Sequence, residues 1–163
     1  MEKAALKEHR RHSTADKPFS YYISNIPEYF PNAPMHWHKE FELNVILEGE
    51  GDFVTGDIHF TAYKGDIVLT PPDMLHAVYQ HDDKRCVYDT LDLDGSMLGS
   101  RDNDRAADAF IAPLISGAYS IETHITPEHC YYSELLTTAE NMISAAKGDT
   151  PLLDMPVSYT HLR

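Results

Sequence analysis

Apolar and polar residues alternate along the segment from residue 40 to residue 48. Phe41, Leu43, Val45 and Leu47 occupy every second position. A period of two is typical of a β-strand whose two faces meet different surroundings, so the pattern predicts a strand over residues 40–48. A continuous apolar face of this size is not expected to lie in water. It must be covered by a second sheet, by C-terminal helices or by another subunit.

Shorter segments of the same kind follow one another through the first 93 residues. Turn residues separate them, such as Gly56-Asp57, a signal for a two-residue hairpin. Pro27, Pro31 and Pro34 predict an irregular chain up to residue 36. Many short strands at nearly regular spacing indicate a sandwich or a barrel. The predicted strands cover residues 19–23, 40–48, 52–55, 58–63, 66–70, 76–80 and 85–93, with a turn at residues 49–51.

The period of the apolar residues changes to 3.6 after a break at residues 94–103 that is rich in Gly and Asp. The change predicts a helix over residues 104–115 and, after it, a short strand over residues 121–125. A second helix is expected to begin at Thr126, where a capping hydroxyl precedes a proline and a carboxylate, and to end at Lys147 before a glycine. Its apolar stripe is either core or a dimer surface, and it comprises Tyr132, Leu135, Leu136, Ala139, Met142, Ile143 and Ala146.

The charge of the chain restricts its partners. Thirteen Lys and Arg stand against 26 Asp and Glu, which gives a net charge of −13. Such a chain repels a phosphate backbone, so small solutes or another protein are the expected partners rather than nucleic acid. The first 18 residues are basic, and we expect a mobile arm or a short helix with a solvated face there. We expect a cytoplasmic protein, because the two cysteines have no CxxC spacing and the sequence shows neither an apolar run of membrane length nor a signal sequence.

A group of polar residues lies at and just before the alternating strand. His36 and His38 are followed by Glu42 four residues later and by Gly49 after seven more. A His-x-His pair alone says little, but the four residues together are expected by chance only roughly 0.002 times in a chain of this composition. A second group, in which a glycine and a proline precede His76, strengthens the pattern.

The spacing of these residues allows their side chains to meet. On a strand, positions i, i+2 and i+6 point to one face, so His36, His38 and Glu42 can converge, and His76 would arrive from another strand. Neutral imidazoles with one carboxylate suit Zn, Fe, Ni or Mn. The alternative is a polar pocket without metal that forms hydrogen bonds to an organic ligand or to water.

Two further residues bear on this geometry. The same parity would turn Glu40 inward, which predicts a bulge near residues 39–41. Tyr88 lies on the predicted strand over residues 85–93 and could reach a pocket inside a barrel, although core packing explains it equally well.

The two groups resemble the two cupin motifs. The segment MHWHKEFELNVILEGEG is similar to the first motif and GDIVLTPPDMLHAVYQ to the second, so this resemblance spans residues 36–80. It implies a cupin double-stranded β-helix, which is a jelly-roll-like barrel, with metal ligands at the three histidines and the glutamate named above. Asp73 replaces the motif's glycine and Gln80 its asparagine. These departures predict a different turn at Asp73 and put in doubt a pocket like that of the cupin enzymes.

The chain as a whole resembles the N-terminal sensory half of AraC-type transcription regulators. The resemblance rests on the order of a basic arm with EHRRH, an aromatic strand with FSYY, the cupin core, and helices with PLISG and TPEHCYYSELL, over roughly residues 8–156. It implies a mainly β fold, a cupin barrel followed by two α-helices. It also implies that a small-molecule effector, a sugar or a related metabolite, binds in the barrel and that the helices form a homodimer. DNA would be bound by a C-terminal half beyond this sequence.

The expected organisation is a basic arm (1–18), a cupin barrel (19–95), a barrel-completing and helical dimerisation segment (96–150) and a tail (151–163). The last residues, PVSYTHLR, carry no cap or periodic pattern. They look similar to a sequencing adapter translated in frame. The natural protein is therefore expected to continue beyond about residue 156.

The resemblance favours a non-enzymatic sensor of a bacterial transcription regulator, in which effector binding shifts the arm or the helix interface between two arrangements. His36, His38, Glu42, His76 and Tyr88 would line the effector pocket, and the first four could hold a divalent transition metal. The alternative is a stand-alone metal-dependent cupin enzyme, such as a dioxygenase or a sugar isomerase. That enzyme would need an open coordination position on its metal. A structural or storage cupin is the third hypothesis.

Overall fold

The computed structural model describes residues 3–98, 109 and 112–148. In this part the chain forms eight strands, two 3₁₀-helices and two α-helices. The strands are β1 (Phe19–Ile26), β2 (Asn32–His36), β3 (Phe41–Thr55), β4 (Ile58–Tyr63), β5 (Ile67–Thr70), β6 (His76–Gln80), β7 (Cys86–Leu93) and β8 (His124–Ile125). The helices are η1 (Lys3–Leu6), η2 (Gly95–Leu98), α1 (Ala112–Ile115) and α2 (Tyr132–Lys147).

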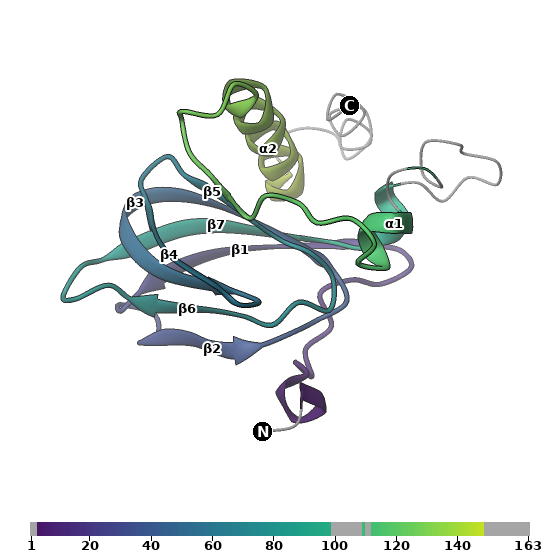
Figure 1. Ribbon diagram of the computed structural model, residues 1–163, viewed down its shortest axis with the longest axis horizontal. Coiled ribbons are helices and arrows are strands. Elements are labelled where there is room, and N and C mark those ends of the chain that lie inside the picture. The colour runs from purple at the N-terminus through teal and green to yellow at the C-terminus, as the bar shows by residue number, and fades with distance from the viewer. Residues whose placement is uncertain (1–2, 99–108, 110–111, 149–163) are drawn as a thin grey trace.

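The strands form two antiparallel sheets that share the long strand β3. The first half of β3 lies in the order β1-β7-β3-β5-β8, and its second half pairs with β4 on one side and β6 on the other, with β2 next to β6. The two sheets face each other as a barrel, and α2 lies across the outside of the first sheet (Figure 1). This arrangement confirms the predicted mainly β cupin barrel followed by two α-helices.

The predicted turn at residues 49–51 is wrong, because β3 runs through it as one strand of 15 residues. The strand bends here instead. Its register with β7 shifts between Ile46 and Glu48, and Gly49 has φ 73°. A Cβ on Gly49 would lie 1.7 Å from the carbonyl oxygen of Arg85, which directly precedes β7. Only glycine fits this bend, which carries β3 from one sheet to the other.

The prediction of an irregular chain before residue 36 is confirmed for residues 27–31 but wrong for residues 32–36. Residues Asn32–His36 form β2, which in the described part of the chain pairs only with β6. An edge strand tolerates Pro34 because one side of it needs no hydrogen-bond donor. The register shifts between Ala33 and His36, and the strand ends with His36 opposite His76.

The remaining strand predictions are confirmed with small changes of boundary. β4 and β6 match their predicted ranges, and residues 52–55 form the end of β3. β1 is three residues longer than predicted, and β5 and β7 each begin one residue later. β8 is shorter than the predicted strand at residues 121–125.

The helices differ more from the predictions. Most of the predicted helix at residues 104–115 lies outside the described residues, and α1 covers only its last four. The second helix starts at Tyr132 rather than near Thr126. Residues 126–131 form turns instead, in which the backbone N–H of His129 donates to the carbonyl of Thr126 at 3.1 Å. The predicted end is confirmed, because Gly148 caps α2 in the left-handed conformation with φ 84°.

The apolar face of the first half of β3 is covered by α2. Phe41, Leu43 and Val45 are buried in one cluster with the helix residues Leu135, Ala139, Met142 and Ile143. The stripe on α2 is therefore core of its own barrel. Leu47 is left 41% exposed, because the register shift after residue 46 turns it away from this cluster.

Both ends of α2 are fixed to the barrel by polar contacts. The Tyr132 hydroxyl donates to the carbonyl of Gly65 at 2.6 Å, and the Lys147 ammonium lies 3.2 Å from a carboxylate oxygen of Asp89 on β7.

Within the described ranges, no helix is both long enough and apolar enough to cross a membrane. The predicted tail at residues 151–163 lies outside the described residues.

The N-terminal arm begins with η1, which is the expected short, exposed helix. The rest of the arm packs on the barrel. Two backbone hydrogen bonds join the arm to Trp37, one from the N–H of Trp37 to the carbonyl of Leu6 at 3.1 Å and one from the N–H of Glu8 to the carbonyl of Trp37 at 3.0 Å. Further along the arm, His12 is 6% exposed. The arm therefore reaches the interior of the protein near the His-x-His segment.

Candidate functional site

The inward faces of β3 and β7 change from polar to apolar along the barrel. Paired positions run from Glu42 opposite Asp92, through Asn44 opposite Thr90, to Ile46 opposite Tyr88. Asn44 links the first two pairs, because its amide donates to Glu42 at 2.7 Å and it accepts from Thr90 at 2.6 Å. The far end is an apolar cluster, comprising Ile26, Ile46, Phe53, Ala62, Val68, Val78, Cys86 and Tyr88. The polar end is the candidate site.

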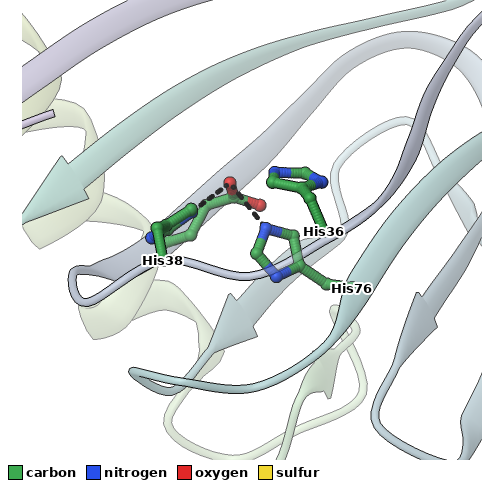
Figure 2. Close-up of side chains that lie close together, drawn as sticks. His36, His38 and His76 are labelled. Carbon is green, nitrogen blue, oxygen red and sulfur yellow. Dashed lines mark hydrogen bonds and ion pairs between the residues drawn. The ribbon is translucent and has the colours of Figure 1, made fainter. Parts of the chain in front are cut away.

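The four predicted ligand residues come together at this polar end. His36 ends β2, His38 lies in the link to β3, Glu42 lies in β3, and His76 begins β6. Their ligand atoms all lie within 4.8 Å of one another. The three histidine rings face one common space (Figure 2), with ring centroids 4.1 Å apart for His36 and His76 and 4.9 Å apart for His38 and His76.

The prediction that His36, His38 and Glu42 converge from one face of a single strand is wrong. His36, His38 and Glu42 do not share one strand, because the chain leaves the extended pattern between β2 and β3. This break takes the place of the bulge expected near residues 39–41. Glu40 is buried beside it, accepts a hydrogen bond from Ser13 at 2.6 Å, and lies 3.5 Å from Nδ1 of His38.

Glu42 is the shared carboxylate of the cluster. Its Oε2 lies 3.4 Å from Nε2 of His38 and 3.4 Å from Nε2 of His76. Burial alone would raise the pKa of Glu42, but the neighbouring His76 and His38 outweigh it and hold that pKa well below its usual value. Glu42 is therefore a carboxylate anion, the form that binds cations or accepts hydrogen bonds.

Two of the histidines direct Nε2 of the ring toward the cluster. Nδ1 of His36 donates to the carbonyl of Pro34 at 2.7 Å, and Nδ1 of His76 donates to the carbonyl of Met74 at 2.9 Å. A backbone carbonyl on Nδ1 fixes the orientation of the ring and directs Nε2 toward the cluster. Burial alone would lower the pKa of His76, but the charge of Glu42 and its hydrogen bond to the ring raise it. Burial, with the neighbouring His76, lowers the pKa of His36, which favours its neutral form.

Several buried polar atoms here have no hydrogen-bond partner among the described residues. They include Nδ1 of His38, Nε2 of His76 and Oδ1 of Asp92. Such atoms cost free energy unless a ligand, an ion or water satisfies them. Three imidazoles and one carboxylate fit a first-row transition metal, such as Zn, Fe, Ni or Mn. They fit the hydroxyl groups of a polar organic ligand equally well.

The arm adds residues that the sequence did not point to. His12 lies between two carboxylates, with Nε2 2.9 Å from Glu8 and Nδ1 2.6 Å from Asp92. Burial alone would lower the pKa of His12, but these two hydrogen bonds raise it to about 11. His12 is therefore an imidazolium whose two N–H groups both donate. The only signal in the sequence is the spacing of Glu8 and His12, one helical turn apart in EHRRH, and it does not indicate which barrel residue they meet.

Asp92 lies beneath this contact and is 1% exposed. Burial raises its pKa, and the nearby Glu42 adds to the effect, while the hydrogen bond from His12 opposes it. Alternation along β7 places Asp92 on the inner face, but no motif singles it out from the neighbouring aspartates. Sequence reasoning therefore missed it.

Tyr88 is on the same inner face but not in the histidine cluster. It is buried in the apolar end of the barrel, with its ring 5.7 Å from that of Phe53. Its role in lining a ligand pocket stays a prediction.

The two departures from the second motif have different outcomes. Asp73 takes φ 61°, the left-handed conformation that a glycine adopts without cost, and its N–H donates to the carbonyl of His38 at 2.8 Å. The replacement therefore keeps a left-handed turn beside the cluster. Gln80 instead ends β6 and donates from its amide to the carbonyl of Lys84 at 3.1 Å, outside the cluster.

Several solved structures are similar to this chain in fold. A cupin 2 conserved barrel domain protein from Salinispora arenicola is 21% identical, with a TM-score of 0.43, over 54% of this chain and 73% of the other. The DMSP lyase DddQ from Ruegeria pomeroyi is 25% identical, with a TM-score of 0.41, over 47% of this chain and 38% of the other.

The sequence also matches a curated protein of Bacillus subtilis, the uncharacterized HTH-type transcriptional regulator YdeC. The two are 27% identical over 89 residues, which are 54% of this chain and 31% of the regulator. This chain therefore spans about a third of the length of that relative. The family of AraC-like ligand binding domains matches residues 20–107, which is more than half of the chain and includes the whole histidine cluster. The chain belongs to the family of AraC-like ligand binding domains.

Proposed function

We propose that this chain is the effector-sensing domain of an AraC-type transcription regulator and does not act as an enzyme. The observation that carries the proposal is the set of buried polar atoms at the polar end of the barrel that lack hydrogen-bond partners among the described residues, within a domain of this family. A sugar or a related metabolite would satisfy them, because each hydroxyl group can both donate and accept. The pocket floor would comprise His36, His38, Glu42 and His76.

The polar network below the cluster supports a ligand rich in hydroxyl groups. Glu42, Asn44 and Thr90 form a continuous chain of hydrogen bonds into the barrel. Buried polar groups of a site stay unpaired when a ligand lacks the matching groups, so such a site binds that ligand much more weakly. We therefore expect discrimination between a sugar and its deoxy analogue.

DNA binding and dimerisation belong to the proposal as well. The relative from Bacillus subtilis is named as an HTH-type regulator, and most of its length lies outside the match. The net charge of −13 makes this chain a poor surface for DNA, so we infer that another part of the regulator, in the cytoplasm, binds it. We also propose a homodimer through the C-terminal helices. Because the apolar stripe of α2 is taken up by its own barrel, the contact would use the outer, polar face of α2.

A screen of sugars and sugar acids by thermal shift tests the sensing proposal. We expect a subset of compounds to raise the melting temperature of the wild type but not of Glu42→Gln or His76→Asn. His59→Asn, a change of an exposed histidine on β4, is the matched control and should respond like the wild type. If no compound stabilises the wild type, or if the cluster variants respond equally, the proposed pocket is wrong.

A stand-alone metal-dependent cupin enzyme is the second candidate. The convergence of three histidines and one carboxylate favours it, because that donor set supports metal-assisted chemistry. Turnover of a substrate by protein loaded with Fe or Mn, with consumption of O₂ for a dioxygenase or aldose–ketose conversion for an isomerase, would support this alternative. Absence of turnover together with stabilisation by a metabolite would favour the sensor.

A further inference from the structure

The carboxylate of Glu8 lies at the edge of the histidine cluster, although it belongs to the arm. Its Oε2 is 3.5 Å from Nε2 of His36. With His12 it also forms a second group around His38, in which the ligand atoms lie within 4.8 Å of one another. Glu8 therefore stands beside two of the four residues that could hold a metal.

The backbone fixes the position of Glu8. Its own N–H donates to the carbonyl of Trp37, and Trp37 donates in return to Leu6, so the arm is held at the residue between His36 and His38. The ammonium groups of Lys3 and Lys7 each lie 5.4 Å from the centre of the Trp37 ring, on which they add cation–π contacts. These contacts fix the register of the arm.

The side chain of Glu8 is oriented by a hydrogen-bonded chain. Nε2 of His12 is 2.9 Å from the Glu8 carboxylate, and Nδ1 of His12 is 2.6 Å from buried Asp92. Carboxylates that bind metals are commonly held by such outer hydrogen bonds, and loss of the partner weakens metal binding. His12 thus acts as a positioning residue for Glu8.

We propose that Glu8 is a fifth ligand of the metal site formed by His36, His38, Glu42 and His76, so that metal binding and docking of the arm are one event. Oε2 of Glu8 lies 3.5 Å from Nε2 of His36, so Glu8 would join the ligand set from the side on which the arm packs. A closed coordination sphere is typical of structural metal sites, whereas catalytic sites keep a position open. The linkage is reciprocal: the ion stabilises the docked arm, and the docked arm tightens binding of the ion.

Metal titration of the full chain tests this inference, which is independent of the proposed function because only metal ions are added. Zn²⁺, Ni²⁺ and Mn²⁺ would be titrated by calorimetry, with a competing chelator for tight binding. We expect one ion per chain and an affinity for at least one metal that falls in Glu8→Gln by roughly 10-fold or more, since loss of an outer hydrogen-bond partner of a ligand alone costs about 10- to 100-fold. Asp16→Asn, which removes an exposed carboxylate from the same arm, should bind like the wild type.

Cleavage of the arm provides a readout that does not depend on affinity. Trypsin has sites at Lys3, Lys7, Arg10 and Arg11, so metal should slow cleavage there in the wild type and in Asp16→Asn. It should not do so in Glu8→Gln or in His76→Asn, which lacks a barrel ligand. Circular dichroism would establish that each variant is folded before it is compared.

Four results would overturn the inference. They are no binding of any of the three ions, equal affinity of Glu8→Gln and Asp16→Asn, binding of two ions per chain with only one lost in Glu8→Gln, and metal-independent cleavage of the arm in the wild type. The third result would mean that Glu8, His12 and His38 form a separate site.

Discussion

Replacement of Gly49 by alanine should destabilise the barrel strongly. Gly49 is the last residue of the first cupin motif and bends β3 between the two sheets. Its φ of 73° is unfavourable for an L side chain, and an added Cβ would lie 1.7 Å from the carbonyl oxygen of Arg85. Since that oxygen is backbone, it cannot rotate away, and β3 and β7 must move apart.

The size of the effect follows from two contributions. A left-handed φ costs about 1–2 kcal/mol with a Cβ, of which about 0.4–1 kcal/mol returns because alanine restricts the unfolded chain. The displacement of β7 also breaks the 3.0 Å hydrogen bond from the N–H of Glu50, which is half-buried, to the carbonyl of Arg85, which is exposed, at a cost of about 0.5–1.5 kcal/mol. Forcing the two strands apart adds about 1–3 kcal/mol, so we expect a loss of about 2–5 kcal/mol in the free energy of unfolding.

Gly117→Ala is the matched control. Gly117 also has a positive φ, 74°, but no heavy atom lies within 4 Å of an added Cβ. Its replacement should cost about 1 kcal/mol or less, from the backbone conformation alone. Urea unfolding followed by far-UV circular dichroism would measure both variants at constant m-value. Equal destabilisation of the two variants would refute the argument, because it would leave no cost for the contact between β3 and β7.

Three further results are expected. Met142→Ala on the buried face of α2 should lower the free energy of unfolding by about 2–5 kcal/mol. Glu140→Ala on the exposed face of α2 should change it by less than about 0.5 kcal/mol. Similar values for the two variants in urea unfolding would mean that α2 does not cover the barrel. His12 has a folded-state pKa of about 11 against an unfolded value near 6.5, so its contribution to stability is complete below pH 6.5 and declines up to about pH 11. The difference in melting temperature between wild type and His12→Gln should therefore shrink from pH 7 to pH 10, and a constant difference would contradict the ion pairs of His12 with Glu8 and Asp92. Burial raises the pKa of Cys86 to about 12, whereas Cys130 is exposed, so a thiol reagent such as DTNB should react with one cysteine per native chain and with two in urea, and rapid reaction of both in the native protein would refute the burial of Cys86.

Alternation and motif spacing predicted most of the barrel, because a strand with one buried face must repeat every two residues. They failed where one signal has two structural outcomes. The glycines at residues 49–51 indicated a turn, but a glycine with positive φ can also bend a continuous strand. Likewise, Pro34 interrupts a central strand but is compatible with the edge position of β2.

The core of the candidate site could be predicted because its residues lie close in sequence or in a recognisable second motif. His36, His38, Glu42 and His76 converge as expected, although through a break between strands rather than along one strand. Glu8 and His12 could not be predicted in this way, because their contacts depend on where the arm packs on the barrel. A helical or extended arm of the same sequence could have met other surfaces.

The start of α2 illustrates a tertiary effect on a local signal. Thr126 and the following proline have the right chemistry for a helix start, but His129 accepts the N–H of Thr126 at 3.0 Å and closes a turn. The helix begins only at Tyr132, whose hydroxyl is fixed on Gly65. The anchor on the barrel thus coincides with the first residue of the helix, and residue preferences alone do not identify it.

The most direct test of the account is an NMR titration that detects the ring nitrogens of the histidines. A stabilising metabolite from the thermal-shift screen would be added to protein labelled with ¹⁵N-histidine. We predict saturable shifts of the rings of His36, His38 and His76, with those of exposed His59 unchanged. Saturable binding of the metabolite without any change at these three rings would contradict the claim that the histidine cluster forms the floor of the effector pocket.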